Sequence, residues 1–68
     1  MTEEQIIAMG LSDKRERALI AVFTHYRASK MFWLLVFARR WGLAAQELLE
    51  TYPVKGRRQF LADAIWEG

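Results

Sequence analysis

The residue types that most often carry catalysis are sparse in this chain, and their spacing favours no reaction. The single histidine, His25, has no carboxylate four residues away on either side. Ser12 and Ser29 have no base nearby in the sequence, and a nucleophile needs a base that a third group orients. Glu47 and Glu50 stand three residues apart, but the Glu-x-x-His spacing of helical carboxylate metal sites is absent. We therefore expect no enzymatic activity.

Binding sites for metals and cofactors are also absent from the pattern. The chain has no cysteine and one histidine, which rules out disulfides and a structural zinc site, and it has no glycine-rich phosphate loop. We expect no cofactor and no metal. The lack of cysteine suits a reducing compartment, and the opening segment 2–5 is polar and acidic, unlike a secretory signal. We expect a cytoplasmic protein.

Eight consecutive apolar residues, Met31–Ala38, lie within a predicted helix. Eight helical positions cover every side of the helix, and a helix that is apolar all round must be enclosed. A chain of 68 residues buries only about 60% of its unfolded surface, and small domains without disulfides or metals often oligomerise. We expect an obligate partner face, used for self-association, target binding or both. The run is far short of the roughly 18 residues that span a bilayer, so no membrane insertion is expected.

Aromatic and arginine residues cluster in and after this run, and both types are typical of interface hot spots. We expect four residues of the run to divide between the core and a homodimer seam: Phe32, Trp33, Val36 and Phe37. Arginine pairs with carboxylates in two-pronged geometry, which favours a docking role. The side chains expected to bind a protein target are Arg39, Arg40, Trp41, Tyr52, Arg57 and Arg58.

The first helix boundaries are marked by local signals, and no segment has the alternation of a strand. Thr2 and Gln5 form a capping-box pattern that opens a short helix over residues 3–9. Gly10 is suited to the positive φ that ends such a helix, and Ser12 is a good N-cap for the next one.

Between residues 13 and 41 there is neither glycine nor proline, so we predict one helix of about 29 residues, some 43 Å long, that ends at Gly42. The alternative is a bend near Ala28–Lys30, which gives two antiparallel helices.

The C-terminal third predicts two more helices, separated by a turn that contains Pro53 and Gly56. The first spans residues 43–51, with Leu43, Leu48 and Leu49 on its inner side. The second spans residues 57–66 and is expected to bury Phe60, Leu61, Ala64 and Ile65. We predict a single all-α domain over residues 1–68, a small helical hairpin or bundle with a long central helix.

The segment Phe37–Leu48 resembles the core of a helix-turn-helix unit. Ala38 lies four residues before Gly42, with apolar residues beside both, as a tight helix crossing requires. The resemblance implies a DNA-binding regulator whose second helix enters the major groove. The residues available for that role are Arg39, Arg40, Gln46, Lys55, Arg57 and Arg58. The second helix has two carboxylates and no Lys or Arg, and the net charge is only +2, so DNA binding is the alternative and protein binding the favoured function.

In its small size, helical hairpin layout and content of Arg and Trp, the chain also resembles phage-encoded host-takeover proteins. These include anti-activators of quorum-sensing receptors and inhibitors of pilus motors. The resemblance implies a homodimeric regulator that inhibits a host protein, such as a transcriptional activator, by occluding one of its surfaces.

Overall fold

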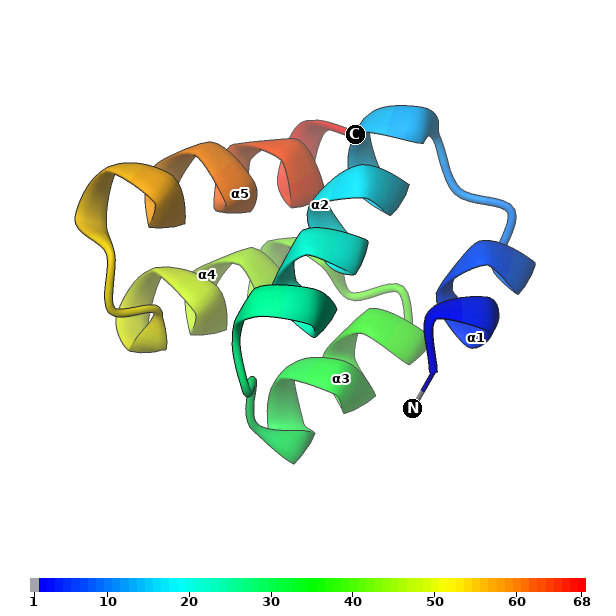
Figure 1. Ribbon diagram of the computed structural model, residues 1–68, viewed down its shortest axis with the longest axis horizontal. Coiled ribbons are helices and arrows are strands. Elements are labelled where there is room, and N and C mark those ends of the chain that lie inside the picture. The colour runs from blue at the N-terminus through cyan, green and yellow to red at the C-terminus, as the bar shows by residue number, and fades with distance from the viewer. Residues whose placement is uncertain (1) are drawn as a thin grey trace.

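Five short α-helices account for the regular structure of residues 2–68, the part of the chain that the computed structural model describes. They are α1 (Glu3–Ala8), α2 (Asp13–His25), α3 (Lys30–Phe37), α4 (Trp41–Thr51) and α5 (Lys55–Glu67). α5 packs against both α4 and α2, α3 packs against α4, and α1 packs against α2 (Figure 1). The prediction of an all-α fold is confirmed. Every helix in this range is too short or too polar to cross a lipid bilayer.

The first two helices begin where the local signals place them. The Thr2 hydroxyl accepts a hydrogen bond from the backbone N–H of Gln5 at 3.3 Å, and the Gln5 side chain accepts one from the N–H of Thr2 at 2.7 Å, which completes the capping box. Gly10 has φ +68° in the link to α2. The Ser12 hydroxyl accepts from the N–H of Arg15 at 3.3 Å and caps α2.

The predicted continuous helix from residue 13 to residue 41 is wrong, and the break of the alternative is present, although α2 and α3 do not pack along each other as an antiparallel pair. α2 ends at His25, Tyr26 is extended with φ −144° and ψ 143°, and Ser29 caps α3 by accepting from the N–H of Phe32 at 3.2 Å. The break therefore falls at residues 26–29, immediately before and within the Ala28–Lys30 segment.

Burial explains why the chain breaks its helix without glycine or proline. A continuous helix of about 43 Å would exceed the longest dimension of the molecule, 29 Å, and would leave Leu19 and Phe32 pointing about 140° apart. The break lets both side chains enter one core. Tyr26 holds the broken segment in place, because its hydroxyl donates to the Thr51 carbonyl at 3.0 Å and its ring packs edge-on against Tyr52 at 4.8 Å.

The turn between α3 and α4 also differs from the prediction, because Gly42 does not form it. Arg39 takes the positive φ, +57°, and the N–H groups of Arg39 and Arg40 donate to the carbonyls of Val36 and Leu35 at 2.9 Å each. This pair of bonds is a Schellman motif with arginine at the position where glycine is usual. Gly42 lies inside α4, where a Cβ would sit 2.6 Å from the Trp66 ring, so its small size serves helix packing.

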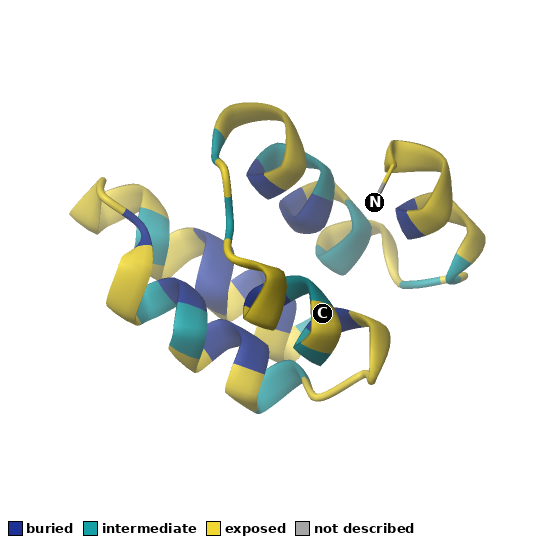
Figure 2. Ribbon diagram, turned by 90° about the horizontal axis from the view of Figure 1, so that it is seen from below, coloured by how far each residue is buried: buried dark blue, intermediate teal, exposed yellow. Residues whose placement is uncertain are grey.

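The core is assembled from the inner sides of all five helices, as Figure 2 shows by the buried positions that face one another. Its largest fully buried side chains are Phe32, Ile6, Leu19, Leu48, Ile65, Val22 and Val36. No charged or polar side chain of residues 2–68 is buried with them. The Cα radius of gyration, 10.4 Å, matches the roughly 11 Å expected of a closed domain of this length.

Replacement of Ser29 with alanine distinguishes a broken helix from a continuous one, because the change in stability has opposite signs in the two cases. Because the hydroxyl caps α3, we expect Ser29→Ala to lower the free energy of unfolding by about 1 kcal/mol. Inside a continuous helix the same change would raise stability slightly, since alanine has the higher helix propensity. Urea unfolding followed by circular dichroism measures the difference, and a stabilised variant would contradict the break.

Candidate protein-binding surfaces

The apolar run that the sequence singled out is only half enclosed by the protein itself. Phe32 and Val36 are buried in the core, whereas Met31, Leu34 and Phe37 remain exposed. These three residues recur every third position and therefore share one side of α3. We call them the α3 stripe.

Two further apolar side chains lie along the edges of the α3 stripe. Trp33 and Leu35 are half-buried and flank the stripe on opposite sides, as their helical angles require. Trp33 packs edge-on against Phe23 of α2, with ring centroids 6.3 Å apart. The four expected seam or core residues thus separate into two core members (Phe32 and Val36), one at the edge (Trp33) and one on the surface (Phe37).

A second apolar feature lies between α2 and α5. It is a hollow of about 430 Å³ lined by Asp13, Lys14, Arg17, Ala18, Ala21, Arg57, Phe60, Leu61 and Ala64. We call it the α2–α5 groove. Its size falls within the range of binding pockets in proteins, and its floor is formed by alanine and leucine side chains.

Phe60 is the most exposed apolar side chain of this groove. It was expected in the core, but 72% of its surface is open to solvent, whereas Leu61, Ala64 and Ile65 are buried as predicted. The same kind of error applies to Leu43, which was expected on the inner side of α4 and is 55% exposed. In both helices the cluster of apolar residues is wider than the contact surface that the neighbouring helices offer.

The arginines expected to bind a target are partly used inside the fold. Arg39 donates from Nη2 to the Met9 carbonyl at 2.8 Å and closes the C-terminal end of α1. Arg58 donates from Nη1 to the Leu49 carbonyl at 2.8 Å and does the same for α4. The last carbonyls of a helix lack intrahelical donors, so both bonds satisfy groups that would otherwise depend on water. Arg40 and Arg57 are exposed, and Arg57 lines the α2–α5 groove.

The two aromatic members of that set are less accessible than expected. Tyr52 is 5% exposed and belongs to the core, so its ring is not on a surface that a partner can reach. Trp41 is half-buried beneath the guanidinium of Arg15, whose Cζ lies 4.2 Å from the ring centroid. The six expected target-binding residues therefore do not form one patch.

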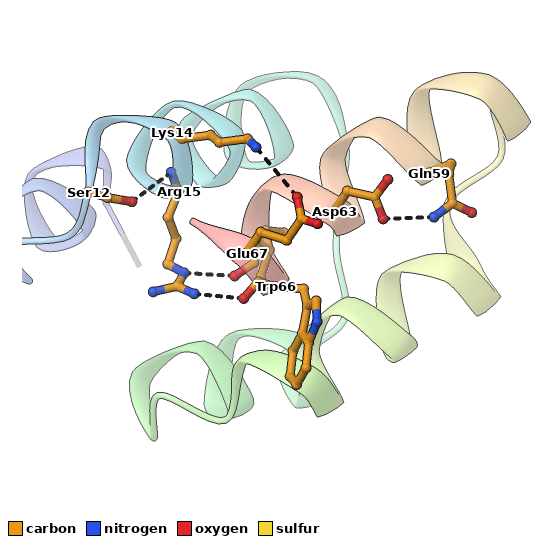
Figure 3. A network of polar contacts seen from close by, with 8 residues as sticks. Ser12, Lys14, Arg15, Gln59, Asp63, Trp66 and Glu67 are labelled. Carbon is orange, nitrogen blue, oxygen red and sulfur yellow. Dashed lines mark hydrogen bonds and ion pairs between the residues drawn. The ribbon is translucent and has the colours of Figure 1, made fainter.

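Arg15 is the central polar side chain of the molecule, and sequence reasoning missed it. Its Nε donates to the Ile65 carbonyl at 2.7 Å and its Nη2 to the Trp66 carbonyl at 3.0 Å, so one guanidinium closes the end of α5 (Figure 3). Desolvation and then the charge of Arg39 lower the pKa of Arg15, but an arginine stays protonated at physiological pH and keeps its donors. Within the cluster Lys14-Arg15-Arg17, nothing local marks Arg15 as different.

The corner expected to resemble a DNA-binding unit has a different register from that pattern. Ala38 caps the end of α3 and Gly42 is helical, whereas the resemblance places the glycine in the turn. The exposed Gln46 amide donates to Glu50 at 3.1 Å, beside the half-buried Glu47. The outer side of α4 therefore presents carboxylates, which phosphate groups repel. Lys55 lies at the start of α5, and Arg40 lies in the α3–α4 turn.

The residues considered for catalysis lie apart from one another. His25 is exposed in the last turn of α2, while Ser12 and Ser29 serve as helix caps. No three metal-ligating side chains of residues 2–68 come together.

Comparison of the chain with protein families, with curated proteins and with solved structures gives no match. The function proposed below therefore follows from the surfaces and contacts of this chain alone.

Replacement of Arg15 tests whether its two carbonyl bonds stabilise the fold. We expect Arg15→Ala to lower the free energy of unfolding by about 2 kcal/mol, because two carbonyls lose a charged donor. Arg15→Lys should recover part of this loss, since an ammonium keeps the charge without the planar fork. Arg17→Ala, on the exposed side of the same helix, is the control and should change stability by less than about 0.5 kcal/mol in urea unfolding. Equal effects at both positions would contradict the role of Arg15.

Proposed function

We propose that this chain is a small protein-binding regulator that acts as a homodimer and occludes a surface of another protein. The observation that supports it most strongly is the α3 stripe, which leaves three large apolar side chains exposed on a helix whose other side is fully used by the core. Contiguous exposed apolar side chains on a small domain are typical of interaction sites. A transcriptional activator is the class of target that the resemblance to phage-encoded anti-activators implies.

The α3 stripe fits self-association because it is apolar and lacks charges of its own. Full burial of a Met, Leu or Phe side chain contributes about 1.5–3 kcal/mol, and these three are already about half-buried, so the stripe supplies about 3–4 kcal/mol. A micromolar complex needs about 8 kcal/mol. A two-fold contact uses the stripe of both protomers, about 6–8 kcal/mol in all. The flanking Trp33, Leu35 and Phe23 are expected to supply the rest and to offset the cost of association.

Self-association is tested at Leu34, which is exposed and makes little contribution to the core. At tens of micromolar protein, light scattering coupled to size exclusion should give a mass near twice 8.0 kDa. We expect Leu34→Asp to give a folded monomer, because a carboxylate in the apolar seam cannot be solvated. Leu43→Asp is the matched control, since both leucines are 55% exposed and position 43 lies on α4. A monomeric parent protein, or a dimer that tolerates Leu34→Asp, would contradict the proposal.

The DNA-binding alternative is tested by electrophoretic shift of duplex DNA at about 50 mM and about 200 mM salt. We expect no shift at either concentration, because the outer side of α4 presents carboxylates. A shift at low salt that is lost at high salt, and that Arg40→Glu with Lys55→Glu abolishes while the mass stays that of a dimer, would favour DNA binding. Arg39 is unsuitable for this test because it closes α1.

A further inference from the structure

The two walls of the α2–α5 groove have the same helical spacing. Besides Asp13 at the start of α2, the lining residues are Lys14, Arg17, Ala18 and Ala21 on α2 and Arg57, Phe60, Leu61 and Ala64 on α5. Both sets follow the i, i+3, i+4, i+7 spacing of one helix side. In Figure 1 the start of α2 lies beside the C-terminal end of α5, so the two helices run past each other along the groove. Two facing stripes on neighbouring helices form a groove suited to a third helix.

The side chains of the floor allow a close approach. Ala18, Leu61 and Ala64 are buried, so their side chains do not protrude from the floor of the groove. Phe60, at the edge of the groove, is 72% exposed. An apolar side chain of a partner that enters the groove would contact the alanines of the floor and the ring of Phe60 at the same time. Docking there removes Phe60 from water, which contributes favourably to binding.

The charges around the groove specify the partner. Lys14, Arg17 and Arg57 line it against the single carboxylate of Asp13. Lys14 is paired with Glu67 at 3.6 Å, an exposed contact that holds it weakly (Figure 3). Within residues 2–68, Arg17 and Arg57 have no ion pair, and both are exposed. The groove thus has an apolar floor and a cationic rim with unused donors.

We propose that the α2–α5 groove binds an acidic amphipathic helix of another protein. One or two apolar side chains of that helix lie on Ala18, Ala21 and Ala64 beside Phe60, and its carboxylates accept hydrogen bonds from Arg17 and Arg57. The lining residues span positions 13–21 of α2 and 57–64 of α5, about 11 Å along each helix, so the groove contacts about two turns of the bound segment. This inference rests on the proposed protein-binding function and assigns the target to a surface separate from the α3 stripe.

A second copy of the chain is a different occupant with a different consequence. Two grooves that face each other would bring their cationic rims together, so the favoured contact joins the groove to another part of the copy and is head-to-tail and open-ended. A closed dimer through the α3 stripe leaves both grooves free for targets. The two occupants therefore differ in the mass of the assembly as well as in the residues involved.

The inference is tested by selecting binders from a randomised library of 16-residue helical peptides displayed against the wild-type dimer. We expect enriched peptides to combine a net negative charge with Leu, Phe or Trp at every third or fourth position. A fluorescein-labelled copy of the most enriched peptide is then titrated by fluorescence anisotropy. Backbone amide shifts of 15N-labelled protein locate its site, and they should move at Ala18, Ala21 and Ala64.

Matched variants of the protein separate the groove from general charge effects. Arg57→Glu should weaken the selected peptide about tenfold or more, because an attractive charge becomes repulsive at the rim. Arg27→Glu makes the same change in the exposed α2–α3 connection and should leave the affinity within about twofold. Phe60→Ser should also weaken binding while the circular dichroism spectrum is kept, since the side chain is mostly exposed.

Several results would overturn the inference. Enrichment of neutral or basic peptides, no enrichment at all, or equal effects of Arg57→Glu and Arg27→Glu would each do so. Concentration-dependent shifts at the groove without peptide would identify a second copy as the occupant. Enriched peptides that bind the α3 stripe would refute the groove as the site while leaving protein binding as the function.

Discussion

The fold depends on arginine side chains that close the C-terminal ends of other helices. Arg15 binds the last carbonyls of α5, Arg39 that of Met9 after α1, and Arg58 that of Leu49 in α4. A domain of this size has few core residues, and no charged or polar side chain of residues 2–68 is buried to orient them. The guanidinium bonds supply that orientation at the surface. Arg39 has a positive φ, which lowers the stability of the fold by about 1 kcal/mol relative to glycine at the same position.

Local signals in the sequence were sufficient for the parts of the fold that local chemistry decides. The caps at Thr2 and Ser12 and the positive φ of Gly10 were predicted, because each depends on residues within three positions. The break at residues 26–29 was only an alternative, since it depends on Tyr26 reaching Thr51 and Tyr52 in α4. Serine is a common N-cap residue, but it also occurs inside helices, so Ser29 alone could not show whether the helix is broken there.

The surfaces were harder to predict than the core. Leu61, Ala64 and Ile65 followed from helical periodicity, whereas the exposure of Phe60 depends on where α2 crosses α5. The same limit applies to the arginines. A cluster such as Lys14-Arg15-Arg17 is read as a solvated side, and only the three-dimensional position of α5 distinguishes Arg15, which is a structural donor, from Arg17, which faces the groove. The apolar run at residues 31–38 was the exception, because its length alone required more cover than one side of a core provides.

The bond between Arg15 and Ile65 has a kinetic consequence. It joins residues 50 positions apart and closes a loop that contains all of α3 and α4 and most of α2 and α5. Closing such a long loop lowers the entropy of the chain before the contacts between α2 and α5 can form. We therefore expect α2 and α5 to associate late in folding. Once closed, the loop opens as a unit, and these helices should exchange their amide hydrogens together. α1 lies outside the loop, attached through Ile6 and the Arg39–Met9 bond, and is expected to detach first.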